Sequence, residues 1–169
     1  GECRNDYGGY FIIDGKEKVL VSQEKFADNM LYVHHNSDSP YACSADIRSV
    51  SEDASKPIRT LSVRIVRPGG ISKRNIPLSC QHIVVSVPNI RKPIPLFTLM
   101  RALGIESDKE ICEYCVPDPE ERKNYLEILR ACVHDAGQIF TQKLAQKFIA
   151  TFSKHKTVIH VLEILSDFL

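Results

Sequence analysis

GGYFIIDGKEKVLVSQE, residues 8–24, decides how the chain begins to fold. Two apolar, β-favouring runs flank Asp14-Gly15, and an Asp-Gly pair between such runs is the strongest short-range signal of a β-hairpin. A two-residue turn needs positive φ at both central positions, which Gly accepts freely and Asp tolerates. The predicted register pairs Ile13 with Lys16, Ile12 with Glu17, Phe11 with Lys18 and Tyr10 with Val19. Neither face of this ribbon is polar throughout, so we expect it to pack on further protein.

Extended runs punctuated by Gly and Pro continue to about residue 92. Leu61, Val63 and Ile65 alternate with polar residues, which is typical of a half-buried strand. A short helical turn is predicted at residues 23–31 and a loop at 36–40. The predicted strands cover residues 31–35, 41–50, 59–66, 73–78 and 82–85. Spacing of this kind indicates an antiparallel sheet.

The pattern becomes helical after Pro-Ile-Pro at residues 93–95. The predicted helices are 96–103 ended by Gly104, 108–115 capped by Asp108, 120–133 as one continuous amphipathic helix, 141–152 capped by Thr141, and 157–169. Strands first and helices second predict an α+β fold, with an N-terminal hairpin and antiparallel strands followed by a C-terminal helical half. We divide the chain into a hairpin segment, residues 1–30, and a domain, residues 31–169, whose strands lie in 31–92 and helices in 94–169.

Size and composition indicate one sizeable core, or one domain with an appendage, in 169 residues. The charge is balanced, with 22 basic and 21 acidic residues, and only mildly graded from +3 over residues 1–95 to −2 over 96–169. Six cysteines at irregular spacing do not fit a secreted disulfide scaffold. The sequence also contains no signal peptide and no run of 18 apolar residues. We therefore expect a soluble intracellular protein without a membrane partner.

The hairpin stretch resembles the GGYFIINGxEKVL signature of the second-largest, β-type subunit of multisubunit DNA-directed RNA polymerases. The resemblance rests on residues 8–15 and 17–20, and it continues at Gln23-Glu24. Later residues are similar to the SP…AEIRS, IPI…FRALGI and paired-helix segments of the same subunit, at 39–49, 59–63, 94–105, 111–115 and 126–135. The resemblance covers nearly the whole chain, from the end of the region called the protrusion through the region called the lobe. We expect the chain to be a piece of a longer polypeptide of eukaryotic, archaeal or large-DNA-virus type.

The resemblance implies a part in DNA-templated RNA synthesis, a nucleotidyl transfer reaction, without catalytic residues in this stretch. The implied role is to form part of the downstream DNA cleft; the alternative is a platform that docks initiation or elongation factors. The implied partners are other polymerase subunits, especially the largest, together with template DNA, the RNA–DNA hybrid and transcription factors. Mg²⁺ and Zn²⁺ are expected elsewhere in the whole enzyme, and no cofactor is expected here. The implied location is the nucleus or, for a virus, the cytoplasmic virus factory or the virion.

Candidate nucleic-acid contacts come from the cations of the strand-rich half, because Lys and Arg contact phosphates without reading sequence. The resemblance places the hairpin near the template and the hybrid, which singles out Lys16, Lys18 and Gln23. The competing interpretation is that Lys18 pairs with Glu17 and only covers the ribbon. The candidates are Lys16, Lys18, Gln23, Arg48, Lys73 and Arg74, and the wider pool adds Arg59, Arg64, Arg91 and Lys92.

A zinc site is the alternative reading of four residues in the helical half. Cys112-x-x-Cys115, followed by Cys132 and His134, has the spacing of structural zinc ligands. Against it, the intervening segment has the pattern of a helix, and Cys132 falls on the apolar stripe of that helix, where a free Cys behaves as a small hydrophobe. We therefore predict core packing for Cys132 and no metal.

Overall fold

The N-terminal hairpin forms as predicted in the computed structural model, which describes residues 3–35, 39–53, 55–68 and 80–166. β1 (Phe11–Ile13) and β2 (Lys16–Lys18) are antiparallel, and their three residue pairs have the predicted register. Asp14 and Gly15 both have positive φ, 52° and 72°, as this turn requires. The fourth predicted pair, Tyr10 with Val19, lies beyond the ladder.

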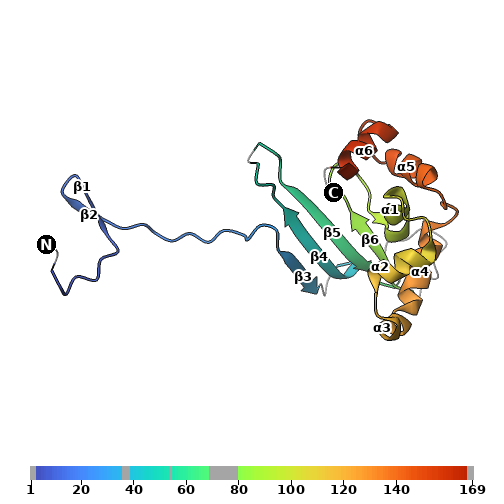
Figure 1. The fold of residues 1–169 in the computed structure, drawn as a ribbon, viewed down its shortest axis with the longest axis horizontal. Helices are drawn as coiled ribbons and strands as arrows, with labels where there is room; N and C mark the ends of the chain where they lie inside the picture. Colours follow the sequence, from blue (N-terminus) through green and yellow to red (C-terminus); the bar gives the residue numbers. More distant parts are fainter. Residues whose placement is uncertain (1–2, 36–38, 54, 69–79, 167–169) are drawn as a thin grey trace.

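A five-stranded antiparallel sheet follows the hairpin, with its strands in chain order (Figure 1). The strands are β3 (Leu31–His35), β4 (Tyr41–Ser49), β5 (Arg59–Val66), β6 (His82–Ser86) and β7 (Ile94–Pro95). Each strand pairs with the next one, so the sheet is a simple meander. The predicted strand at residues 73–78, and most of the predicted loop at 36–40, lie outside the described residues.

The predicted helical turn at residues 23–31 is wrong. Residues 23–27 have no regular structure, and a turn at 28–29 leads directly into β3. The reason lies at Asn29, which has a φ of 59° and is bonded to the end of β4. Its backbone N–H donates to the Arg48 carbonyl, while its side chain accepts from the Val50 N–H and donates to the Val50 carbonyl. These bonds hold the backbone in a non-helical conformation that Asn tolerates better than most residues.

The helical half contains six described helices. They are α1 (Leu96–Ala102), α2 (Asp108–Cys115), α3 (Pro119–Asn124), α4 (Leu126–Ala136), α5 (Gln142–Ala150) and α6 (Val158–Ser166). Gly104 ends the first helix with a φ of 109°, and the Thr141 side chain caps α5, both as predicted. The N-cap of α2 is Ser107 rather than Asp108. Strands then helices make the chain an α+β protein, as the sequence predicted.

The single helix predicted over residues 120–133 is wrong, because the structure divides it into α3 and α4 at Tyr125. Asp118 caps α3 and Pro119 occupies its first turn, so a new helix begins there. The Tyr125 N–H bonds to the Arg122 carbonyl, three residues back, which tightens and ends that helix. None of the residues of α3 is buried, so no packing holds it in line with α4.

One face of the sheet packs against the helices and forms the core. Leu61, Val63 and Val85 lie on this face, since residues directly opposite in antiparallel strands project to the same side. Over them pack α1, α5 and α6, through Leu99, Ala102, Ala145, Ile149, Val161 and Ile164. A second cluster joins α1, α2 and α4, through Phe97, Ile111, Leu129, Cys132 and Ala136. Each large apolar side chain buried there contributes roughly 1.5–3 kcal/mol to folding.

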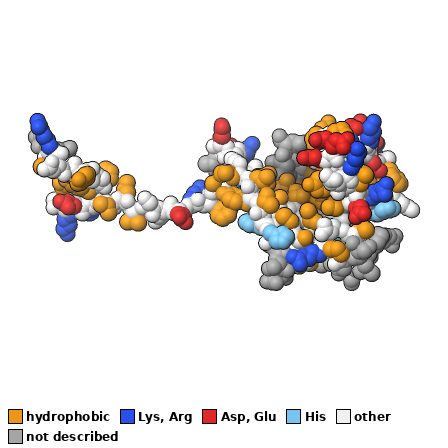
Figure 2. All heavy atoms as spheres, turned by 90° about the horizontal axis from the view of Figure 1, so that it is seen from below, with side chains coloured by type: hydrophobic (Ala, Val, Ile, Leu, Met, Phe, Trp, Pro, Cys, Tyr) orange, Lys and Arg blue, Asp and Glu red, His pale blue; other side chains and the backbone are white. Residues whose placement is uncertain are grey.

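The apolar face of the sheet continues beyond the helices. The strand register aligns Leu31 and Ile47 with Leu61, and Val33 with Val63. Figure 1 shows the helices gathered at the β6 side, with β3 at the far edge of the sheet. Leu31 and Val33 are consequently 62% and 64% exposed. Figure 2 shows hydrophobic side chains on this strand-rich side of the body, next to the linker.

The hairpin stands apart from this body and is joined to it by an extended linker, residues 19–27 (Figure 1). Both of its faces are open: Phe11 on one and Ile12 on the other are more than half exposed. Among the described residues, no helix combines the length and apolar character needed to cross a membrane.

Candidate nucleic-acid interface

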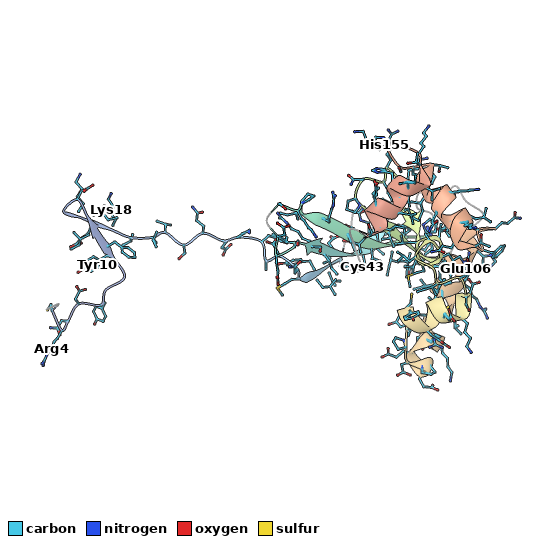
Figure 3. The ribbon with its side chains drawn as sticks, turned by 45° about the horizontal axis from the view of Figure 1, so that its top comes forward. Arg4, Tyr10, Lys18, Cys43, Glu106 and His155 are labelled. Atoms are coloured by element: carbon cyan, nitrogen blue, oxygen red, sulfur yellow. The ribbon has the colours of Figure 1, made fainter. Side chains whose placement is uncertain are left out.

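Lys16 and Lys18 project from the same face of β2, because alternate residues of a strand share a face. They lie opposite Ile13 and Phe11, and Figure 3 shows Lys18 at the isolated end of the molecule. Glu17, between them, projects to the other face and lies opposite Ile12. Neither lysine makes an ion pair within the part of the chain that the structure describes. The geometry therefore does not support the pairing of Lys18 with Glu17, and both ammonium groups are exposed cations.

The carboxylate nearest in sequence to the hairpin on its N-terminal side is already engaged. The Tyr10 hydroxyl donates to the Asp6 carboxylate, and the Gly8 N–H donates to Asp6 Oδ1 at 3.0 Å. These bonds lower the pKa of Asp6 and raise the pKa of Tyr10, each chiefly through the shared hydrogen bond. They close a short loop that leads into β1.

The other two candidates in the described strand-rich half differ in their surroundings. Gln23 is exposed on the linker. Arg48 on β4 lies beside Asp28, with Nε 3.4 Å from Oδ1, and Lys25 reaches the other oxygen of that carboxylate at 3.4 Å. A phosphate would have to compete with Asp28 for Arg48. Lys73 and Arg74 lie outside the described residues, and their candidacy stays a prediction.

Two further cations of the wider pool lie over aromatic rings. Arg64 lies 5.0 Å from the ring centre of Tyr41, and Lys92 lies 5.3 Å from that of Phe152. Such contacts hold a cation in place and leave its charge available to a partner.

The described residues do not group the four members of the zinc alternative as metal ligands, although Cys112 packs against the core cluster that contains Cys132. Cys132 lies in the core, where its Sγ accepts a hydrogen bond from the Ile83 N–H at 3.2 Å. Burial raises the pKa of the Cys132 thiol to about 12, which opposes the thiolate form that binds metal. His134 lies two residues further along α4, on its exposed side, because residues two apart on a helix do not share a face. Among the described residues, no three His, Cys, Asp or Glu side chains are grouped to hold a metal ion.

Cys112 and Cys115 lie three residues apart on α2, and Cys115 is exposed. Burial is also the main reason that the pKa values of both thiols are raised. Neither thiol is therefore an activated nucleophile.

Two lysines that lie beside Arg91 and Lys92 were missed by the sequence reasoning. Lys154 and Lys156 lie in the connection between α5 and α6, and an isolated antiparallel bridge joins Ser153 of this connection to Ile90. The Arg91 N–H also donates to the Phe152 carbonyl at 3.2 Å, so Arg91 and Lys92 lie beside the two lysines. The available signal was the absence of any Asp or Glu from residues 137–162.

Comparison with known proteins adds a second line of observations. Residues 1–166 match the family model described as "RNA polymerase beta subunit". The chain is 37% identical over 150 residues to "DNA-directed RNA polymerase II subunit RPB2" of Encephalitozoon cuniculi, and equally to "DNA-directed RNA polymerase II subunit 2" of Arabidopsis thaliana. Each alignment covers 88% of this chain and 12% of the relative, so the chain spans about an eighth of their length. It is also 34% identical over 129 residues to "DNA-directed RNA polymerase subunit Rpo2N" of Halobacterium salinarum, covering 76% of this chain and 22% of that protein.

Proposed function

Because the chain belongs to the RNA polymerase beta subunit family, we propose that it is part of the second-largest subunit of a DNA-directed RNA polymerase. In that enzyme it contributes to DNA-templated RNA synthesis by forming part of the wall of the downstream DNA cleft. The observation that carries the proposal is the family match over residues 1–166, supported by 37% identity to RNA polymerase II subunits.

The chain's own contribution is non-catalytic in this proposal. The Cys132 thiol is buried and protonated, and the described carboxylates form no cluster of the kind that holds two Mg²⁺ ions. The described residues offer no such ligand set, and the proposal assigns Mg²⁺ and Zn²⁺ to other parts of the enzyme. The chain contributes binding surfaces in this proposal, namely the exposed cations of the hairpin and the uncovered apolar face of the sheet.

Lys16 and Lys18 are the proposed phosphate contacts of the hairpin. Their support is geometric, since both project from one face of β2 and neither is paired with a carboxylate among the described residues. Gln23 follows on the linker. Such contacts add affinity and register without reading sequence.

A second role, as a protein-docking surface, is favoured by the uncovered apolar side chains. Large apolar side chains are exposed on the edge strand, at Leu31 and Val33, and on both faces of the hairpin. Contiguous exposed apolar surface of this kind marks interaction sites in soluble proteins. The partner that fits is another part of the polymerase assembly, since the chain spans only 12% of relatives that are themselves named as subunits. Docking of a transcription factor on the same face is the alternative outcome.

An affinity tag on this protein in its own host tests the proposal. We expect the other polymerase subunits to co-purify in fixed proportion, and the eluate to incorporate nucleotides on a DNA template. Recovery of the chain without a largest RNA polymerase subunit would overturn the proposal. The double variant Leu31→Ser, Val33→Ser then separates the partners: loss of subunits indicates the assembly, whereas loss of a transcription factor alone indicates the alternative.

The cellular location follows from the proposed enzyme. We expect the protein in the nucleus if the polymerase is that of a eukaryotic cell, and in the virus factory or virion if it is viral. Fluorescence of the tagged protein distinguishes these locations.

A further inference from the structure

Opposite charges are segregated to two ends of the helical half. Residues 106–127, which contain α2 and α3, hold eight acidic and three basic side chains. Residues 137–166, which contain α5 and α6, hold four lysines and one carboxylate, Glu163. Figure 1 shows α3 and α6 at opposite ends of the helical layer. The nearly neutral total charge of the chain hides this separation.

The basic end is completed by a loop from the sheet. We define it as Arg91, Lys92, Lys154, His155 and Lys156, all of which are exposed. Ile90 and Ser153 lie opposite each other in the antiparallel bridge, and Ser153 is buried. Arg91 and Lys154 each directly follow a residue of this bridge, and both are exposed, so the bridge brings the two cation-bearing segments together at the surface.

The cations of the basic end have no carboxylate partner within the described chain. Arg91, Lys154 and Lys156 make no ion pair there, and Lys92 contacts only the Phe152 ring. The nearest acidic group along the chain, Glu163, is engaged by His160, whose Nδ1 lies 3.4 Å from Glu163 Oε2, and His160 in turn stacks edge-on with His155. Figure 3 shows His155 at the outer end of this region. Among the residues that the structure describes, the charge at this end is therefore net positive.

We propose that the basic end binds the phosphate backbone of a nucleic-acid duplex. The identity of the polyanion rests on the proposed function, because a polymerase subunit works beside nucleic acid. A duplex fits better than a single strand, which is usually held by bases stacked on open aromatic rings. The ring beside these cations, Phe152, is half-buried and already covered by Lys92 and Phe148. Lysines on two loops form point contacts to phosphates and carry no base readout.

The test measures binding of the 169-residue chain to a fluorescent duplex of mixed sequence by anisotropy, over about 50–200 mM salt. The basic-end variant combines Arg91→Ala, Lys154→Ala and Lys156→Gly; glycine is chosen at residue 156 because φ there is 53°. The matched control removes the same charge elsewhere, with Lys109→Ala, Lys123→Ala and Arg130→Ala. Circular dichroism and Tm confirm that both variants fold.

We expect the basic-end variant to lose roughly tenfold or more in duplex affinity and to flatten the plot of log affinity against log salt by about 1 per residue. The control should lose no more than about threefold, through net charge alone. Equal losses in both variants, an unchanged basic-end variant, or no duplex binding at the lowest salt would each overturn the proposal. So would a variant that keeps duplex affinity and loses only a polyglutamate peptide, because the partner would then be an acidic protein segment.

This test is separable from that of the proposed function. If the chain purifies with the polymerase but still binds duplex normally after the three substitutions, the proposed function is supported and the proposed site is wrong. If the substitutions reduce duplex affinity but the chain never associates with polymerase subunits, the proposed site is supported and the proposed function is wrong.

Discussion

The hairpin and the sheet–helix body are held together by different means. Phe11 in the hairpin is 54% exposed, whereas Phe97 in the body is completely buried. The hairpin has a turn, three residue pairs and no core, and an isolated two-stranded ribbon is only marginally stable in water. Its sequence nevertheless carries a strong local signal, the Asp14-Gly15 pair between two apolar runs, and the structure has the predicted register. A strongly specified sequence in a weakly supported element indicates that its packing partner lies elsewhere, which agrees with the proposed place in a larger assembly.

The largest difference in stability between the two regions is expected from truncating a phenylalanine in each. Phe97→Ala should lower the free energy of unfolding by about 3–5 kcal/mol, because it removes a buried ring and leaves a cavity between α1, α2 and α4. Phe11→Ala serves as the matched control and should change it by less than about 0.5 kcal/mol. Urea unfolding of both variants measures the difference. A comparable loss in Phe11→Ala would show that the hairpin packs on the body in solution.

A smaller effect is expected at the buried cation of the body. Arg101 is 1% exposed, and its guanidinium bonds to Asp108 and to the Ile139 carbonyl and lies 5.4 Å from the Phe140 ring centre. Asp108→Ala should cost about 2 kcal/mol, since it leaves a buried charge without its carboxylate. Glu110→Ala, an exposed carboxylate in the same helical turn, controls for the helix dipole. Equal Tm values for the two variants would show that solvent replaces Asp108.

Alkaline pH should weaken the body through Cys132. Burial raises the pKa of its thiol from 9.0 to about 12, so above pH 9 the unfolded chain loses a proton that the folded chain keeps. The contribution of this group is complete below pH 9 and is lost as the pH rises towards 12, by up to about 1.4 kcal/mol per pH unit. Unfolding at pH 8 to 10, compared with Cys132→Ala, isolates the effect from other groups. An identical pH slope in the variant would contradict the buried thiol.

The smallest effect on overall stability is expected in the hairpin turn. Gly15→Val places a β-branched residue at a φ of 72°, which is strained. The global unfolding free energy should stay within about 0.5 kcal/mol, because no core residue contacts the turn. Amide exchange of β1 and β2 should nevertheless become faster. Slower global refolding or a lower Tm would show that the hairpin contributes to the fold of the body.

Short sequence patterns predicted those elements whose conformation depends on residues close together in the chain. The Asp14-Gly15 pair predicted the hairpin and its register, and alternation predicted β5. Gly104 predicted the end of α1, and Thr141 the start of α5. Each of these depends on residues a few positions apart, so a single sequence carries enough information.

Other features depend on contacts between distant residues. Asn29 is non-helical because it bonds to the end of β4, some twenty residues later in the chain, and no local pattern shows that. The break at Tyr125 is made by local hydrogen bonds, but the helical spacing of apolar residues does not show that α3 stays unburied. The basic end of the helical half needs a bridge between residues 90 and 153 before its cations meet. The mild overall charge gradient could not show this, because acidic and basic segments cancel in the sum.

The Asn29 turn also sets where a mechanical load enters the body. Any pull on the hairpin passes through the linker and reaches the sheet at residues 27–29. The Tyr32 hydroxyl donates to the Ala27 carbonyl, Asp28 lies beside Arg48, and Asn29 is anchored by three hydrogen bonds to Arg48 and Val50 at the end of the neighbouring strand. The anchor must break before tension reaches the β3–β4 pairing. Tension on the arm is thus delivered to the longest strand of the sheet, β4, before it can peel away the edge strand.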